Sequence, residues 1–516
     1  MRTRSEFKTY KNLLLNAQPP NRYKSTDLSH LIYLAFFTKY FFFVKNDLTL
    51  DMNALSSILV GFTVIIIVSC QTPREGNLKI ENVNVVNVRQ GRIIESQDVV
   101  IQGNKITSIS EYQNTVFGGD VIDGTGKYLI PGLWDMHTHI FSTNIDSLSY
   151  RMNLSNKLMI ANGVTGFREM GYTIEEAAET FREKVRNRDY LPQRFIYTTQ
   201  ALDGDPPVWN WPDVVKAIQN PQQATAAIDS IMSHTKADFI KVYSVLSPES
   251  YMTISAYCQK NDIDFAGHFP VNTPLSAIAQ SGIKSLEHGF ELIPAYSSRA
   301  DSLVEDGELS GSEYRTMFGD NHEESANDFF ELLRENQVWI TPTLTINQGL
   351  ALFSSSDTLE IEDERKKYVD WKEWQGPPPE AHSYYDEVFN LVKKRIKPAH
   401  SAGVGILAGT DIGFSNPFVY DGFSLHEELK MLVEAGLTPT EALKTATLNP
   451  AIYINATDSL GTVEENKLAD LVILNQNPIE DISHTRNIYG VLSNGNYFDS
   501  VTLSNLLAEV EEFYNN

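Results

Sequence analysis

The sequence predicts an α/β fold: a (β/α)8 TIM barrel with a small β-sandwich domain built from both ends of the chain. Strand-like runs rich in Val and Ile follow residue 77 and return near the C-terminus. Between them, strand-sized apolar runs alternate with helical stretches, and the length of 516 residues exceeds what one core usually fills. We therefore expect residues 77–130 and 455–516 to form the β-sandwich and residues 131–454 to form the barrel.

The residues before position 77 are predicted to precede the folded domains. An apolar run at residues 55–68 is short for a membrane span but suits the core of a signal peptide, and it leads into Ser69 and Cys70. This junction is similar to a bacterial lipoprotein cleavage site, at which Cys70 would carry the lipid.

Met52 begins this signal-like segment. Residues 52–76 are therefore expected to be a lipoprotein-type signal segment and linker, and residues 1–51 an N-terminal extension or a mis-assigned start. An N-terminal anchor that is never cleaved is the alternative. In either case we expect the protein in the bacterial cell envelope, as a membrane-anchored lipoprotein or a periplasmic, extracytoplasmic protein. A homo-oligomer stays an open alternative.

The composition excludes two classes of protein. The net charge of −24 argues against a nucleic-acid-binding protein, because phosphate binding needs a basic surface. The chain has only two cysteines, Cys70 and Cys258, which excludes a disulfide framework and a cysteine-ligated structural zinc site. Cys258 lies in a predicted helix, where a buried thiol is expected.

Short runs bounded by turn residues predict the β-sandwich. On the N-terminal side they are LKIENVNVV, RIIESQDVVIQ, KITSIS and DVIDGTGKYLIPG, and on the C-terminal side GTVEENKLADLVILN and YGVLSNGNYFD.

Eight further apolar runs predict the barrel strands. They are LIPGLWDMHTH, GVTGFREMG, RFIYTTQ, ADFIKVYS, DFAGHFP, IKSLEHG, VWITPTL and VGILAGTD. Eight βα units favour a barrel over an open sheet. After the eighth strand, Thr438 to Glu441 have the pattern of a capping box, and Gly436 suits the end of the preceding helix. Longer segments at about 291–335 and 351–400 are expected to be lids or rim elements.

Polar side chains end several of the predicted strands. His137 and His139 are two residues apart on the first strand, so both point to the same face, although a lone pair of this kind could be exposed. Three further polar residues close the fifth, sixth and eighth strands: His268, His288 and Asp411. Barrel active sites collect at this end of the strands.

Lys241 is the discriminating residue among these polar residues. It lies on the fourth strand between Ile240 and Val242, where a bare ammonium group would be costly. A chemical modification or a partner is therefore expected, and an ion pair with a buried acid is the alternative.

In order along the chain, these motifs resemble those of the amidohydrolase superfamily. The matching barrel motifs are PGLWDMHTH, GVTGFREMG, FIKVYS, AGHFP, SLEHG and AGTD, and TLNPA and KLADLVIL are similar to the segments that re-enter its β domain. The resemblance covers residues 78–480 and is strongest to the branch with imidazolonepropionase-like proteins and Xaa-Pro dipeptidases.

The resemblance implies a site for two divalent metal ions, most commonly zinc. His137, His139 and Asp411 would hold one ion, and His268 and His288 the other. Lys241, carboxylated by CO2 to a carbamate, would bridge the two. Nitrogen and oxygen ligands with open positions also admit Mn, Co or Fe.

The implied activity is hydrolysis of a C–N bond, amide or peptide-like, in a small substrate through a metal-bridging hydroxide. Asp411 would act as general base and then acid. Tyr243, on the same face as Lys241, would donate a hydrogen bond to the oxyanion or the substrate; packing at the barrel mouth is the alternative. Arg168 and Glu169 are expected to form a structural ion pair, and His426 to cap or pack.

Two other functions stay open. A mononuclear deaminase-like member of the superfamily would not need Lys241, and a non-catalytic ligand-binding lipoprotein would not need all six ligands. Dipeptides or acylated amino acids are the expected substrates, with cyclic amides and lactones behind them. Specificity is expected in the loops at 203–215 and 351–400, which are rich in Trp and Tyr.

Overall fold

In the computed structural model, Asn77–Asn516 form one compact unit, separate from residues 1–76. The structure describes residues 77–141, 145–305, 311–352, 367–368, 382–413 and 418–515. The predicted signal segment and the lipid attachment at Cys70 therefore lie outside the described residues, as does much of the 351–400 loop. Among the described residues, no helix combines the length and the apolar character needed to cross a bilayer.

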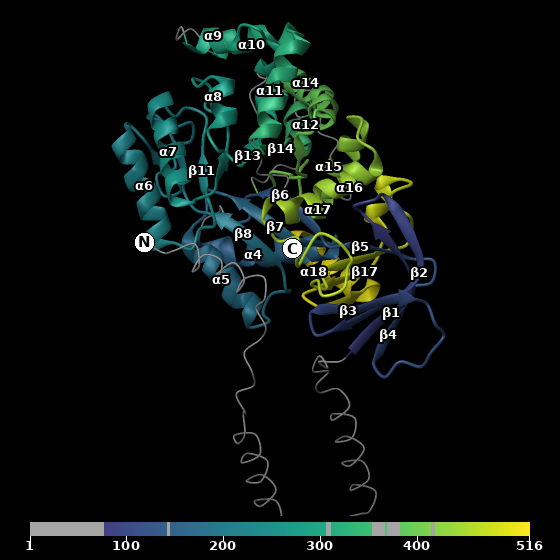
Figure 1. Ribbon diagram of the computed structural model, residues 1–516. Coiled ribbons are helices and arrows are strands. Elements are labelled where there is room, and N and C mark those ends of the chain that lie inside the picture. The colour runs from purple at the N-terminus through teal and green to yellow at the C-terminus, as the bar shows by residue number, and fades with distance from the viewer. Residues whose placement is uncertain are drawn as a thin grey trace, which may run out of the picture. The chain divides into compact units, whose positions relative to one another are not determined.

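One sheet joins the two ends of this compact unit. Its order is β18-β17-β16-β5-β1-β2-β3, and β4 pairs with β1. The strands are β1 (Asn77–Asn87), β2 (Arg92–Gln102), β3 (Lys105–Glu111), β4 (Asp120–Asp123), β5 (Tyr128–Pro131), β16 (Leu471–Leu474), β17 (Ile488–Ser493) and β18 (Asn496–Asp499). β16 runs antiparallel to β5, so the ends meet there, as the purple and yellow strands of Figure 1 show.

Bulges in β1 let this sheet enclose its own core. The register of β1 against β2 shifts between Ile80 and Val83 and again before Val85, and Asn82 has a φ of 53° at the irregularity. Bulges increase strand bending and twist. β1 consequently pairs with β4 through its first half and with β5 through its second. The strands share a buried cluster made of Ile80, Val83, Val85, Val99, Ile101, Ile106, Ile122, Leu129, Val463, Ala469, Leu471, Ile473 and Leu492.

Each of the eight predicted barrel runs contains a strand, and neighbouring strands are parallel. They are β6 (Leu133–Thr138), β7 (Val164–Met170), β8 (Arg194–Thr198), β11 (Ile240–Val242), β12 (Phe265–Gly267), β13 (Ser285–Glu287), β14 (Trp339–Thr341) and β15 (Gly405–Ile406). β6 and β7 are buried at every position, as expected for strands covered on both faces.

Backbone contacts close the ring at both seams. β8 continues into β9 (Ala201–Asp203), which pairs with β11, and Asp238 N donates to Tyr197 O at 2.7 Å. On the other side, Met136 N of β6 donates to Ala408 O at 2.9 Å, just after β15. The predicted fold class is confirmed. The predicted domain limits stay a prediction, since residues 77–516 form one compact unit.

Helices surround the strands (Figure 1). The longer ones are α4 (Ile145–Ala161), α5 (Glu175–Arg186), α6 (Pro221–His234), α7 (Pro248–Asn261), α11 (Glu323–Glu335), α14 (His382–Ser401), α15 (Phe423–Glu434) and α18 (Ser500–Asn515). The predicted capping box of Thr438 and Glu441 starts α16 (Pro439–Thr445), and Gly436 follows α15 with a φ of 107°. Cys258 is buried in α7, as expected.

The two segments expected to be lids or rims each contain a long regular helix. α11 occupies the end of the first segment and α14 the end of the second, so each supplies the helix that precedes the next barrel strand. The prediction was too broad because the many acidic residues of α11 and the many polar and basic residues of α14 obscured their apolar faces.

Candidate metal centre

The six residues predicted as ligands lie at one end of the barrel. His137 lies on β6, with His139 directly after it, and Lys241 lies on β11. His268 directly follows β12, and His288 directly follows β13. Asp411 follows Thr410 in the segment that comes after β15. All five basic side chains are buried, and Asp411 has a 14% exposed side chain.

Asp411 lies between His137 and His139. Its Oδ1 is 3.1 Å from His139 Nε2 and 3.3 Å from His137 Nε2. On the other side of the His139 ring, the Nδ1 atom lies 3.0 Å from Gly171 O. Both Nε2 atoms thus face one carboxylate oxygen, which is how ligands of a single cation would be arranged.

His268 and His288 form the second part of the cluster. Their Nε2 atoms are 3.0 Å apart, while the Nδ1 atoms contact the hydroxyls of Ser244 and Thr343 at 2.9 and 2.8 Å. The His288 ring lies 4.8 Å from the His137 ring, centroid to centroid. The structure therefore brings both predicted histidine pairs together. Their roles as ligands stay a prediction.

Backbone strain marks the same positions. His288 has a φ of 70° and Asp411 a φ of 61°, in the left-handed region that non-glycine residues rarely adopt. Such conformations cost on the order of 1–3 kcal/mol each and cluster at functional sites. Gly409 also allows a close approach, because a Cβ there would lie 2.8 Å from His137 Cβ. The strain and the close approach both serve to aim side chains into the cluster.

The donor atoms fit a divalent metal ion. Among the described residues, the buried atoms His137 Nε2 and Asp411 Oδ1 have no hydrogen-bond partner. His137, His288 and Asp411 each offer a ligand atom within 4.8 Å of the others. A buried lone pair without a partner is costly, and nitrogen with carboxylate oxygen is a ligand set suited to zinc and related ions.

The electrostatic environment keeps His268, His288 and Asp411 in their ligand forms. Burial lowers the pKa of His288 to about 3 and puts the pKa of His268 well below its ordinary value. Burial opposes ionisation of Asp411, but His137 and His139 outweigh it and hold the pKa of this carboxyl well below its usual range. Neutral imidazole and ionised carboxylate are the states that bind metal.

Lys241 is 1% exposed, and burial lowers its pKa to about 8 against the opposing charges of Glu287 and Asp411. Among the ion pairs of the described residues, none joins Lys241 to either acid. The alternative of a lysine paired with a buried acid is therefore not supported by these contacts.

The expected Arg168–Glu169 ion pair is wrong. Arg168 instead binds Glu287, with its Nη2 2.9 Å from both carboxylate oxygens. Glu169 accepts the backbone N–H groups of Ile140 and Phe141 at 2.8 and 2.9 Å. Adjacent residues of a strand point to opposite faces, so neighbours in sequence rarely pair.

Glu287 is the residue that the sequence reasoning missed. Its Oε2 accepts a hydrogen bond from His137 Nδ1 at 2.7 Å, and Ser285 Oγ donates to its Oε1 at 2.5 Å. The whole group is fully buried. With Nδ1 donating to Glu287, the lone pair of His137 Nε2 faces the cluster. Carboxylates commonly orient metal-binding histidines in this way.

Replacing Glu287 with Gln is expected to weaken metal binding by about 10- to 100-fold, the usual cost of losing such an orienting carboxylate. The change removes the charge that fixes the His137 tautomer and leaves Arg168 without its counter-charge. Equilibrium dialysis with zinc measures the affinity. Glu428→Gln is a matched control, because Glu428 is equally buried but accepts from Leu344 N and Thr345 N. Equal affinities in both variants would contradict the orienting role.

Tyr243 lies against the second histidine pair. Its ring centroid is 3.8 Å from that of His268, and its Oη accepts a hydrogen bond from Trp209 Nε1 at 2.9 Å. Burial raises the pKa of Tyr243 to about 12, so the hydroxyl keeps its proton. His426 is buried in α15 and contacts Thr485 Oγ1 and Asn162 O, which agrees with packing and not with a cap.

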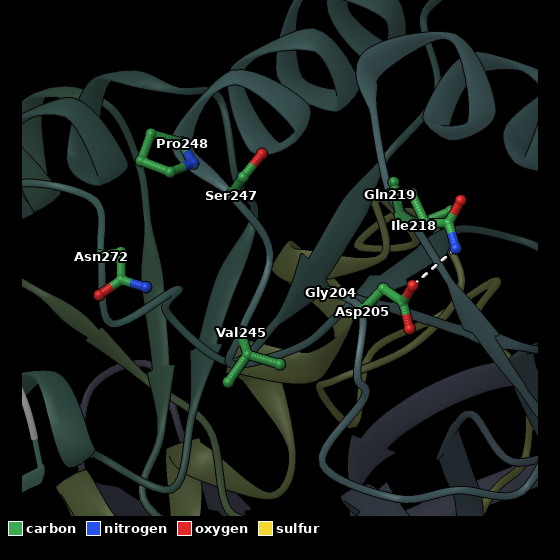
Figure 2. A pocket seen from close by; sticks show the side chains of 8 residues that line it. All are labelled: Gly204, Asp205, Ile218, Gln219, Val245, Ser247, Pro248 and Asn272. Atoms are coloured by element: carbon green, nitrogen blue, oxygen red, sulfur yellow. Dashed lines mark hydrogen bonds between the residues drawn. The ribbon is translucent and has the colours of Figure 1, made fainter.

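A cavity of about 430 Å³ opens among the loops that follow β9 to β12. It contains none of the six predicted ligands. Its lining residues are Gly204, Asp205, Ile218, Gln219, Val245, Ser247, Pro248 and Asn272, and Figure 2 shows the hydrogen bond from Gln219 Nε2 to Asp205. Because Val245 and Asn272 each follow a predicted ligand by four residues, the cavity lies at the same end of the strands.

Comparisons with known proteins identify the family of the chain. The profile of the Amidohydrolase family matches residues 128–497. An adenine deaminase of Staphylothermus marinus is 21% identical over 424 residues, or 78% of this chain and 54% of the relative. The chain thus spans about half the length of that relative.

Two solved structures are similar in fold. A Xaa-Pro dipeptidase with bound methionine is 20% identical with a TM-score of 0.64, covering 82% of this chain and 100% of that one. A prolidase complexed with N-methylphosphonate-L-proline is 18% identical with a TM-score of 0.63, covering 82% and 99%. Since the family profile spans more than half of the sequence, the predicted resemblance is confirmed: the chain belongs to the amidohydrolase family.

Proposed function

We propose that the protein is a metal-dependent amidohydrolase that cleaves a C–N bond, amide or peptide-like, in a small substrate. The observation that carries this proposal is the convergence of four histidines, a lysine and an aspartate at one barrel mouth. Within that cluster, the buried His137 Nε2 and Asp411 Oδ1 have no hydrogen-bond partner among the described residues.

Two divalent ions, proposed to be zinc, would be held by this cluster. His137, His139 and Asp411 would hold one ion, and His268 and His288 the other, with Lys241 between them. When bound, such ions polarise a scissile carbonyl and activate water near neutral pH. The protein excludes bulk water from the site, since its histidines are buried.

Lys241 would be carboxylated. Its lowered pKa makes the neutral amine accessible near neutral pH. That amine forms a bond to the carbon of CO2 and releases one proton, which leaves a carbamate anion. The reaction replaces a costly buried cation with two oxygen donors.

Asp411 would carry the proton. Its carboxylate is ionised at neutral pH, so it can accept a proton as water adds to the carbonyl carbon. The same carboxyl then delivers the proton to the nitrogen as the C–N bond breaks. Tyr243, which keeps its proton, would donate a hydrogen bond to the developing oxyanion.

A dipeptide or an acylated amino acid is the proposed substrate class. The similar solved structures are those of a Xaa-Pro dipeptidase and a prolidase, while the similar curated relative is a deaminase. Lys241 on β11 favours the two-metal hydrolase over a mononuclear deaminase, and the complete donor set disfavours a non-catalytic binding protein.

The location in the bacterial envelope, with lipid on Cys70, is proposed on the sequence alone. Incorporation of labelled fatty acid in cells producing the wild-type protein or Cys70→Ser tests it. The wild-type protein should carry the label and the variant should not, and a membrane-bound wild-type protein without label would favour the uncleaved anchor.

Chelation is expected to abolish hydrolysis, and zinc is expected to restore it at about two ions per chain. Metal analysis of the dialysed and reconstituted protein, with a screen of dipeptides and N-acyl amino acids, measures both results. Adenine serves as the deaminase substrate in the same screen. Ammonia release from adenine at one ion per chain would favour the mononuclear alternative, and activity that survives complete metal removal would refute the proposal.

A further inference from the structure

The loop between β9 and β10 (Val215–Ala217) exposes apolar side chains beside the metal centre. Val208, Trp209 and Trp211 are 48, 44 and 43% exposed. The two indole rings stack, with centroids 5.1 Å apart and planes inclined by 21°. A stacked pair of half-exposed tryptophans leaves a large apolar area in water, and exposed apolar patches commonly mark binding sites.

Ring contacts connect this pair to the predicted ligands along two paths. Trp211 packs edge-on against Tyr172 at 5.8 Å, and Tyr172 lies 5.2 Å from the His139 ring. Trp209 donates to Tyr243, whose ring lies over His268. Each indole is therefore separated from a predicted metal ligand by a single tyrosine, which places the pair on the route to the barrel mouth.

The loop is held in this conformation before any ligand binds. The buried Asp203 carboxylate accepts from Val208 N at 2.8 Å and from Val245 N at 2.9 Å. Trp211 O accepts from Val214 N and Val215 N at 3.0 and 2.8 Å. Because these bonds tie both ends of the loop to the barrel, the indoles stay exposed without a further ordering cost.

We propose that Trp209 and Trp211, supported by Tyr243 and the buried Tyr172, form an aromatic wall that binds a flat apolar side group of the substrate. This inference rests on the proposed function, because it names the substrate class of the same site. The ligand is an N-acyl amino acid or dipeptide whose side group is an aromatic ring. Aliphatic neighbours of the wall, Val208 and Val214, favour an apolar group over a cation.

The test compares two probes that differ only in the side group and contain no amide bond that the site could cleave, phenylalanine and alanine. Binding to the zinc-loaded protein is followed by calorimetry, independently of turnover. Trp211→Ala is expected to weaken phenylalanine-probe binding by about 3- to 10-fold, the range for a lost aromatic contact, and to leave the alanine probe unchanged. Trp211→Phe should restore most of the preference, which a collapsed loop could not do.

The control is Phe513→Ala, which removes an exposed aromatic side chain from α18, a helix that contacts α4 and β18. It should leave both probes unaffected. Equal losses for both probes in Trp211→Ala would overturn the wall. The wall would also be overturned if the wild-type protein sediments as a dimer, Trp211→Ala sediments as a monomer and probe binding is unchanged. The tryptophans would then form an interface between two copies. If the zinc-loaded wild-type protein hydrolyses no amide substrate but still prefers the phenylalanine probe in a Trp211-dependent way, the proposed function is refuted and the proposed wall is not.

Discussion

Lys241→Ala is expected to lose one of two bound metal ions and most of the hydrolytic activity. The substitution removes the group proposed to bridge both ions. A Lewis-acid contribution of several kcal/mol corresponds to a loss of at least about 100-fold in kcat/KM. Metal analysis of the purified variant, together with kinetics on the best substrate of the screen, measures both effects.

Two comparisons make this result specific to the bridging role. Lys467→Ala is a matched control, because Lys467 is also a buried lysine but contacts Glu464 and Leu460 O in the loop before β16. It should keep both metals. A short carboxylic acid added to Lys241→Ala should restore part of the activity by supplying the missing oxygen donors. Two tightly bound metals and full activity in Lys241→Ala would show that the carbamate assignment is wrong.

Asp411→Asn is expected to lower kcat by about 100- to 10,000-fold, the usual contribution of a general acid–base group. The amide has the shape of the carboxyl but cannot accept the proton of the attacking water. It also removes the negative charge facing His137 and His139. Steady-state kinetics and metal analysis across a range of zinc concentrations separate the two effects.

The zinc dependence decides what Asp411 does. If activity stays low when the variant is saturated with zinc, the lost proton acceptor is responsible. If saturation restores full activity, Asp411 serves only as a ligand, and its role as base is refuted. Glu428→Gln is the control for an acid-to-amide change at another buried site, where burial raises the pKa of the acid to about 8, and it should keep its kcat.

The sequence was sufficient to predict which strands form the barrel and which polar residues end them. β6 and β7 are buried throughout, so their apolar runs stand out, and His137 and His139 follow the period of two. The strand limits were predicted less well. The run from Ala237 to Ser244 contains a strand of only three residues, Ile240–Val242.

Contacts between distant residues could not be predicted in the same way. His137 and Glu287 are 150 positions apart, and their hydrogen bond exists only because β6 and β13 face one barrel interior. A possible signal was present, since Glu287 directly precedes His288 on a buried strand and a buried acid requires a partner. Trp209 was expected in a specificity loop, but its bond to Tyr243 depends on how that loop folds back.

Diffraction from crystals of the zinc-loaded protein, recorded at the zinc absorption edge, tests the central claim most directly. We predict two anomalous peaks at the barrel mouth, one beside His137, His139 and Asp411 and one beside His268 and His288. Density for a carboxylated Lys241 should lie between them. A single peak, or zinc bound away from these six side chains, would contradict the two-metal site.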